Sequence, residues 1–203
     1  MKPGPKPAIE QALTELRKTR LLLQSDTALP SVASIVAGES IRGSWWSHPK
    51  SNDIYWTLEG LEDSPEVLQV KLLKGKMTLV HRSLWPALLA VGSSDAAWQT
   101  AKLSKSAQSL LSRVRRQGSL RLDQLQRWSA AKKPGDAARE LEGRLLVYSR
   151  EIHTDSGAHT KELESWSHLA ERLGLEKLPP ASQAQAEIER LVPATGKRLL
   201  PWQ

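Results

Sequence analysis

Apolar residues in the first part of the chain recur at helical spacing. Ile9, Leu13 and Leu16 form one stripe within residues 7–24, between basic and polar positions, and this predicts an amphipathic helix. Residues 31–37 have a Pro before them and a Gly after them, the order that is typical of helix starts and ends. We therefore expect two helices before residue 40.

The next stretch changes from a loop to a helix and then to strands. Residues 41–49 are rich in Gly, Ser and Pro, which predicts a loop, and Ser51 is a suitable N-cap for a helix over 52–61. Two β-prone runs at 67–73 and 76–81 are separated by a Lys-Gly pair, and this pattern predicts a hairpin. We expect these elements to form a small helical domain with one hairpin.

The second half contains a helix, short strands, further helices and a hairpin. In chain order, we expect a helix at 104–117, a strand at 119–121, helices at 122–128 and 136–143, strands at 144–152 and 160–166, and a tail helix at 181–191. Small polar residues at Gly92 to Ala96 interrupt both patterns and predict a linker. The predicted fold class is mainly α with short β-hairpins (α+β), with domains at 1–92 and 104–166 and a tail at 167–203.

The segment SLLSRVRRQGSLRLDQL, residues 109–125, resembles the first helix, Gly turn and second helix of the winged-helix DNA-binding superfamily. The resemblance extends over about residues 104–166, a third of the chain. It implies that the third helix contacts duplex DNA in the major groove and that the hairpin reaches the DNA backbone or the minor groove.

The resemblance also implies roles for basic residues by position. It assigns Lys132, Lys133 and Arg139 to the third helix and its start, Arg144 and Lys161 to the wing or its neighbourhood, and Arg113, Arg115 and Arg116 to phosphate contacts from the first helix. Each is also compatible with an ordinary solvated charge. Asp136 and Glu140 depart from the expected basic third helix, which leaves a scaffold or protein-binding role open.

The charge balance favours a polyanionic partner. Twenty-nine Lys and Arg against 22 Asp and Glu give a net charge of +7, which favours nucleic acid through counterion release. Double-stranded DNA is the expected partner, and a merely basic protein is the alternative. The absence of Cys excludes disulfides, thiolate metal sites and cysteine nucleophiles.

Targeting and membrane segments are not evident. The first seven residues form a Lys/Pro/Gly arm without an apolar stretch, and no run approaches the roughly 20 apolar residues of a membrane span. We expect a cytoplasmic protein without a membrane partner.

Two adjacent aromatics, Trp45 and Trp46, lie in the Gly/Ser/Pro loop. Such a loop is difficult to bury completely, and an exposed Trp can stack on a nucleobase. Neighbouring side chains point in different directions. We therefore expect one of the two to fill the core and the other to line a cleft, although both can belong to the core.

Three short patches contain four of the five His: GSWWSHP, HRSLWPALL and HTDSGAH. His48 precedes a helix N-terminus, where an anion is favoured, and we expect it to line a pocket with His81 and Arg82. His153 and His159 flank the predicted wing turn and are expected to approach each other across the hairpin. Their alternative role is to brace that turn.

These His make an enzyme site a hypothesis, whereas no cofactor is expected. Asp53, Glu151 and Asp155 could add ligands to these His in a metal site, but no recognised ligand spacing such as HExxH occurs, so we expect no metal. In a base-excision enzyme, Asp53 or Glu59 would activate water and a Trp would support the extruded base.

Three functions follow from these observations. The first is a winged-helix protein that binds DNA largely through phosphates, in repair or regulation. The second is a glycosylase-like enzyme on DNA, whose catalytic candidates are His48, Asp53, His81, His153 and His159. The third is an interaction factor that binds a protein partner or forms a homodimer.

Overall fold

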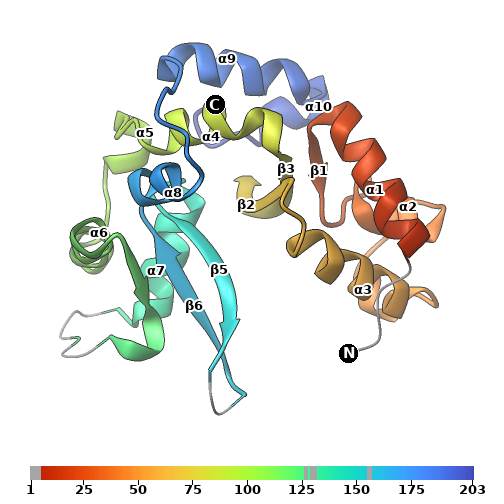
Figure 1. Ribbon diagram of the computed structural model, residues 1–203, viewed down its shortest axis with the longest axis horizontal. Helices are drawn as coiled ribbons and strands as arrows, with labels where there is room; N and C mark the ends of the chain where they lie inside the picture. The colour runs from red at the N-terminus through yellow and green to blue at the C-terminus, as the bar shows by residue number, and fades with distance from the viewer. Residues whose placement is uncertain (1–5, 126–127, 129–131, 155–156) are drawn as a thin grey trace. The chain divides into compact units, whose positions relative to one another are not determined.

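The computed structural model describes residues 6–125, 128, 132–154 and 157–203 (Figure 1). Helices alternate with strands that form two three-stranded antiparallel sheets, which confirms the mixed α+β class. Contacts divide the chain into two compact units. The first contains residues up to Trp85 together with Glu187–Pro201 and Gln203, and the second contains Pro86–Ala186 and Trp202. None of the described helices has the length and apolar character that crossing a membrane requires.

In the first unit, helices and 3-10 turns pack around one sheet. Its elements are α1 (Lys6–Thr19), β1 (Leu21–Leu23), α2 (Val32–Ala37), the 3-10 turn η1 (Trp45–Ser47), α3 (Ser51–Glu62), β2 (Val67–Leu73), β3 (Lys76–His81), η2 (Arg82–Leu84) and α10 (Ala194–Lys197). The sheet order is β1-β3-β2, and the predicted hairpin is confirmed. Leu16, Leu22, Ile54 and Leu79 are fully buried where the helices pack on the sheet.

Two local predictions for this unit were wrong. The first helix ends at Thr19 rather than Gln24, because Arg20 takes a positive φ of 64° and the three leucines after it form the edge strand β1. Two of these leucines are buried, which a continued helix would not achieve. Ser51 is the first residue of α3 rather than its N-cap, since its N–H already bonds to the carbonyl of His48.

The second unit begins at Pro86, within α4 (Trp85–Gly92), and covers the segment for which a winged helix is expected. Its further elements are α5 (Ala97–Thr100), α6 (Lys105–Gln117), β4 (Ser119–Arg121), η3 (Leu122–Gln124), α7 (Pro134–Gly143), β5 (Tyr148–His153), β6 (His159–Glu164), α8 (Trp166–Arg172) and α9 (Ala181–Leu191), the end of which belongs to the first unit. The Ser104 side chain caps α6 by accepting the N–H of Ala107 at 3.2 Å. Leu110, Leu141 and Leu163 form the centre of the core between α6, α7 and the sheet.

Several boundaries in the second unit differ from those predicted. The strand expected to reach Trp166 ends at Glu164, and Trp166 begins α8. The strand expected from Arg144 begins at Tyr148, because the Arg144 guanidinium bonds to carbonyls of the α5 region and Leu145 takes a φ of 50°. The helix expected at 122–128 is a 3-10 turn that ends at Gln124. Residues 126 and 127 of that expected helix lie outside the described residues.

The division between the units falls at Trp85, before the expected linker. The side chain of Gln99 joins that linker to the second unit: its Oε1 accepts the N–H of Ala96 at 2.9 Å, and its Nε2 donates to the carbonyls of Gly92 and Leu145. The tail also does not stand alone. The Lys74 N–H donates to the Leu199 carbonyl at 2.8 Å within the first unit.

Candidate functional site

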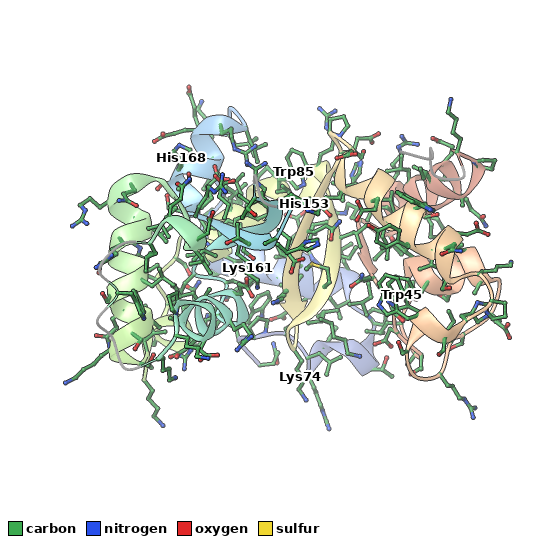
Figure 2. All side chains as sticks on the ribbon, turned by 90° about the horizontal axis from the view of Figure 1, so that it is seen from below. Trp45, Lys74, Trp85, His153, Lys161 and His168 are labelled. Atoms are coloured by element: carbon green, nitrogen blue, oxygen red, sulfur yellow. The ribbon has the colours of Figure 1, made fainter. Side chains whose placement is uncertain are left out.

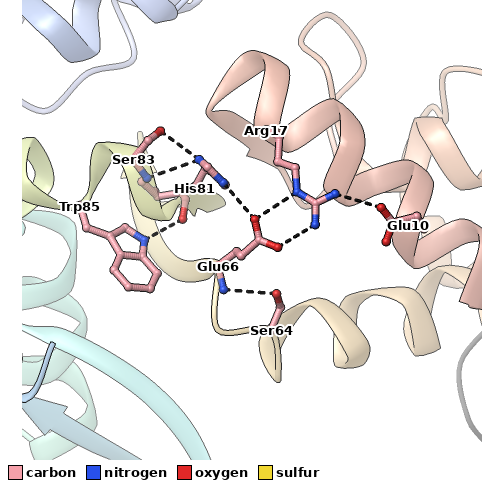
Figure 3. Close-up of polar contacts among 8 residues, drawn as sticks. Glu10, Arg17, Ser64, Glu66, His81, Ser83 and Trp85 are labelled. Atoms are coloured by element: carbon pink, nitrogen blue, oxygen red, sulfur yellow. Dashed lines mark hydrogen bonds and ion pairs between the residues drawn. The ribbon is translucent and has the colours of Figure 1, made fainter.

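His81 lies at the end of β3 with both ring nitrogens in polar contacts (Figure 3). Its Nε2 lies 3.2 Å from Oε2 of Glu66, and its Nδ1 lies 2.9 Å from Oγ of Ser83. Nδ1 also accepts the backbone N–H of Ser83 at 3.3 Å, so the imidazole caps η2. An ionised Glu66 accepts from Nε2–H, which leaves the Nδ1 lone pair facing Ser83.

Glu66 is held more strongly by Arg17 than by His81. The guanidinium donates two parallel bonds, Nε to Oε2 at 3.0 Å and Nη2 to Oε1 at 2.7 Å, and its third nitrogen donates to Glu10 at 2.9 Å (Figure 3). Chiefly because of Arg17, and secondarily because of His81, the pKa of Glu66 is lowered from 4.5 to about 2. The same pairing raises the pKa of Arg17. The carboxylate therefore stays ionised in nearly all conditions and ties α1 to the start of β2.

We expect Glu66→Gln to destabilise the first unit at neutral pH. The variant loses a bidentate ion pair at the surface, and we expect a small but measurable fall in the free energy of unfolding. The contribution of Glu66 is fully present above pH 4.5 and is lost as the pH falls towards about 2. Urea unfolding of wild type and variant at several pH values should therefore show a difference that shrinks below pH 4.5; a difference independent of pH would contradict this role.

Ser83, His81 and Glu66 follow the order hydroxyl, imidazole, carboxylate that nucleophilic triads use. Here the same Nδ1 also accepts the Ser83 N–H, and the N–H of Arg82 donates to the Glu66 carbonyl. These local bonds explain the arrangement as a cap for η2. The exposed Arg82 side chain is close to this turn in the chain, but none of these bonds involves its guanidinium.

His48 has partners of its own in the first unit. Its Nε2 lies 3.3 Å from Oε1 of Glu39, and its Nδ1 accepts the N–H of Lys50 at 3.2 Å. Lys50 in turn donates through Nζ to the last carbonyls of α2, because the C-terminal end of a helix attracts positive charge. Asp53 is exposed in the first turn of α3, and Glu59 is exposed near its end. The contacts of His48 therefore differ entirely from those of His81.

Of the two adjacent tryptophans, one is buried and the other is exposed, as predicted, whereas the cleft expected beside the second stays a prediction. Trp45 is buried in the first unit (Figure 2), whereas Trp46 is 60% exposed and is the most exposed large apolar side chain in the described part of the chain. Their rings stack with centroids 4.1 Å apart and planes 24° apart. The ring centroid of Tyr55 lies 5.7 Å from that of Trp46, and the ring centroid of Trp56 lies 5.0 Å from that of Tyr55. Trp46 is thus an exposed aromatic face on a rigid aromatic support.

This division predicts that the same substitution has a large effect at Trp45 and a small effect at Trp46. Trp45→Ala should lower the free energy of unfolding by about 3–5 kcal/mol, as expected for a large buried side chain. Trp46→Ala should change the free energy of unfolding by at most about 0.5 kcal/mol, because the exposed side chain loses mainly its stacking contact with Trp45. Urea unfolding of both variants measures the contrast, and equal losses would show that Trp46 is part of the core.

Most of the basic residues predicted to contact DNA have partners inside the second unit. Four of them form ion pairs: Arg115 with Asp95, Arg139 with Asp136, Lys132 with Glu140 at 3.0 Å, and Lys161 (Figure 2) with Glu142. The Arg144 guanidinium donates to backbone carbonyls. The Arg113 guanidinium lies 5.9 Å from the centre of the Trp128 ring. Arg116 and Lys133 are exposed and have no ion pair among the residues that the structure describes.

His153 and His159 face each other in the second unit, as predicted. They are directly paired in the β5–β6 register, and their ring centroids are 4.3 Å apart. The fifth His, His168, serves a different site: it and Arg172 bond to the buried Glu164. Although burial raises the pKa of Glu164, these two bonds hold it below its usual value. Within the described ranges, no three His, Asp or Glu side chains are placed to hold one metal ion.

The contacts of Arg17 and Glu66 were not found from the sequence. The two residues are 49 positions apart, so no local pattern joins them, and only the packing of α1 beside β2 brings them together. Comparison with protein-family models, with curated proteins and with solved structures found no match.

Proposed function

We propose that residues 104–166 are a winged-helix module that binds duplex DNA largely through its phosphates. The observation that carries this proposal is the way in which the segment closes into one sheet. The short strand β4 pairs with β6 rather than with its nearer neighbour β5, giving the order β4-β6-β5 with α6 and α7 packed on it. Winged helices are typically ordered as a helix, a short strand, two helices and a hairpin. In this chain the 3-10 turn η3 occupies Leu122–Gln124, where the second helix is expected.

The packing of α7 against the hairpin supports this proposal. Glu142 of α7 accepts bonds from Ser149 of β5 and Lys161 of β6, so the helix is fixed to one face of the wing. In DNA-binding winged helices, helix and wing contact the same duplex. A fixed geometry between them allows both to touch DNA without an ordering cost.

The acids of α7 favour contact with phosphates over sequence reading. Glu140 accepts the N–H and the hydroxyl of Ser104, both at 2.8 Å, and Asp136 pairs with Arg139. The helix surface therefore has little net charge for base contacts. Lys133 at its start and Arg116 on α6 supply the exposed cations, and phosphate contacts position a protein without specifying sequence.

A titration of labelled duplex DNA by fluorescence anisotropy tests this function. We expect binding that weakens as salt rises, with a slope of about −0.9 in log K per phosphate contact. Duplexes of the same length but unrelated sequence should bind with similar affinity. Absence of binding at low salt, or binding that is indifferent to salt, would remove the proposal.

The exposed Trp46 supports a second candidate, an activity of the first unit on unpaired bases. An aromatic face stacks on any base, and such stacking contributes about 1–3 kcal/mol per base. A glycosylase-like reaction would add a carboxylate such as Asp53 to activate water. Incubation of damaged and undamaged oligonucleotides with wild type, His48→Ala and Asp53→Asn tests it, and identical products from all three would remove this candidate.

A further inference from the structure

His153 and His159 occupy the last paired position of the β5–β6 hairpin. Both side chains are exposed, their rings are tilted by 52°, and the centroids are 4.3 Å apart. Neither ring has a hydrogen-bond partner among the described residues, in contrast to His48, His81 and His168. The wing therefore presents two uncommitted imidazoles that point towards one another.

The surroundings of this pair make it attractive to a cation. Residues two apart on a strand share a face, so Glu151 lies on the same face as the two His. Its cross-strand neighbour Lys161 is paired with Glu142 instead, so the exposed Glu151 carboxylate has no ion pair among the described residues. The pair thus has a nearby negative charge, and the closest positive charge on that face is neutralised.

We infer that His153 and His159 form a two-imidazole site for a divalent transition-metal ion such as Zn²⁺. Two imidazole nitrogens on one zinc ion, each bound at about 2.0–2.1 Å, lie about 3.3 Å apart in tetrahedral geometry. In such a site the ring centroids lie about 5 Å apart, because each nitrogen lies about 1 Å from its ring centroid. Rings whose centroids are 4.3 Å apart reach this separation by small side-chain rotations, since both side chains are exposed. Imidazole suits Zn²⁺, Ni²⁺ and Cu²⁺ better than it suits Mg²⁺ or Ca²⁺.

The remaining coordination positions are open to water or to an anionic oxygen. This is the arrangement of an open site rather than of a closed structural site, which has four protein ligands. The inference goes beyond the proposed DNA binding and does not rest on it. If the wing lies on DNA, however, a bound cation between two imidazoles places positive charge where the phosphates would be.

Calorimetric titration of the full chain, without a polyhistidine tag, with ZnCl₂ in metal-free buffer and without DNA tests this inference. We expect saturation at one zinc per chain. Both His153→Ala and His159→Ala should weaken the affinity by about tenfold or more, since loss of a ligand costs at least as much as loss of a supporting group. Glu151→Gln should weaken it less, because its charge acts from a distance.

Thr160→Ala is the matched control, because Thr160 belongs to the same strand but to the opposite face. It should leave zinc affinity unchanged. The His153, His159 and Glu151 side chains are exposed and Thr160 is partly buried, so far-UV circular dichroism verifies that each variant is folded. Nitrogen NMR shifts of the two imidazoles should move on zinc addition. Equal zinc binding by wild type and both His variants, or no saturable binding by wild type, would overturn the inference.

Discussion

Replacing Arg116 and Lys133 together by Gln should weaken binding to every duplex to a similar extent. Both side chains are exposed and lack ion pairs among the described residues, whereas their basic neighbours Arg115, Lys132 and Arg139 are already paired. Each lost phosphate contact should reduce the magnitude of the slope of log K against log salt by about 1. The slope of the double variant should therefore be smaller in magnitude by about 2.

The matched control for this variant removes the same charge elsewhere. Lys74 and Lys177 are exposed and lie outside residues 104–166, so Lys74→Gln/Lys177→Gln leaves the net charge equal to that of the test variant. Anisotropy titrations at three salt concentrations should show a near wild-type slope for the control. An equal loss in both double variants would mean that DNA responds to net charge alone and that the winged helix has no defined phosphate contacts.

Trp166→Ala should destabilise the second unit more than any surface change does. Trp166 is 3% exposed at the start of α8, its Nε1 donates to the Leu145 carbonyl at 2.7 Å, and its ring lies directly against Gly92. Removal of such a ring costs about 3–5 kcal/mol, and the Leu145 carbonyl loses one of its donors. Urea unfolding followed by circular dichroism measures the loss.

Two further variants separate packing from the hydrogen bond. Trp166→Phe keeps an aromatic ring but loses the donor, so it should cost less than Trp166→Ala. Gly92→Ala keeps Trp166 but places a methyl group 2.3 Å from its ring, which is too close for ordinary contact. We therefore expect this variant to lower the free energy of unfolding as well. A change within about 0.5 kcal/mol for Trp166→Ala would show that this contact does not hold the second unit together.

Local sequence patterns predicted the regular elements well where one face of an element is buried. The hairpin at 67–81 and the helix at 181–191 appear at the expected bounds, because turn chemistry and apolar spacing specify them without long-range help. Failures occurred where tertiary contacts decide. Leu21–Leu23 continue a helical pattern but pair with β3, and Arg144 is held by carbonyls about 45 residues earlier in the chain.

The candidate sites show the same distinction. The approach of His153 to His159 was predictable, since a hairpin brings its flanking residues together. The partners of the charged residues were not. Glu140 appeared from the sequence to oppose DNA binding, yet it binds Ser104 and Lys132. Burial raises the pKa of Glu140, but the bonds from these two partners outweigh burial and leave the pKa lowered. A charge cannot be assigned to solvent, structure or ligand until its neighbours are known.

The most direct test of the proposed function is to locate the residues that contact DNA. Backbone amide NMR shifts of the isotope-labelled protein, recorded during addition of a short duplex at low salt, locate the contact residue by residue. The winged-helix proposal predicts shifts concentrated in α6, the start of α7 and the β5–β6 hairpin, with those at Arg116 and Lys133 among the largest. Shifts confined to the first unit, around Trp46 and α3, would contradict it.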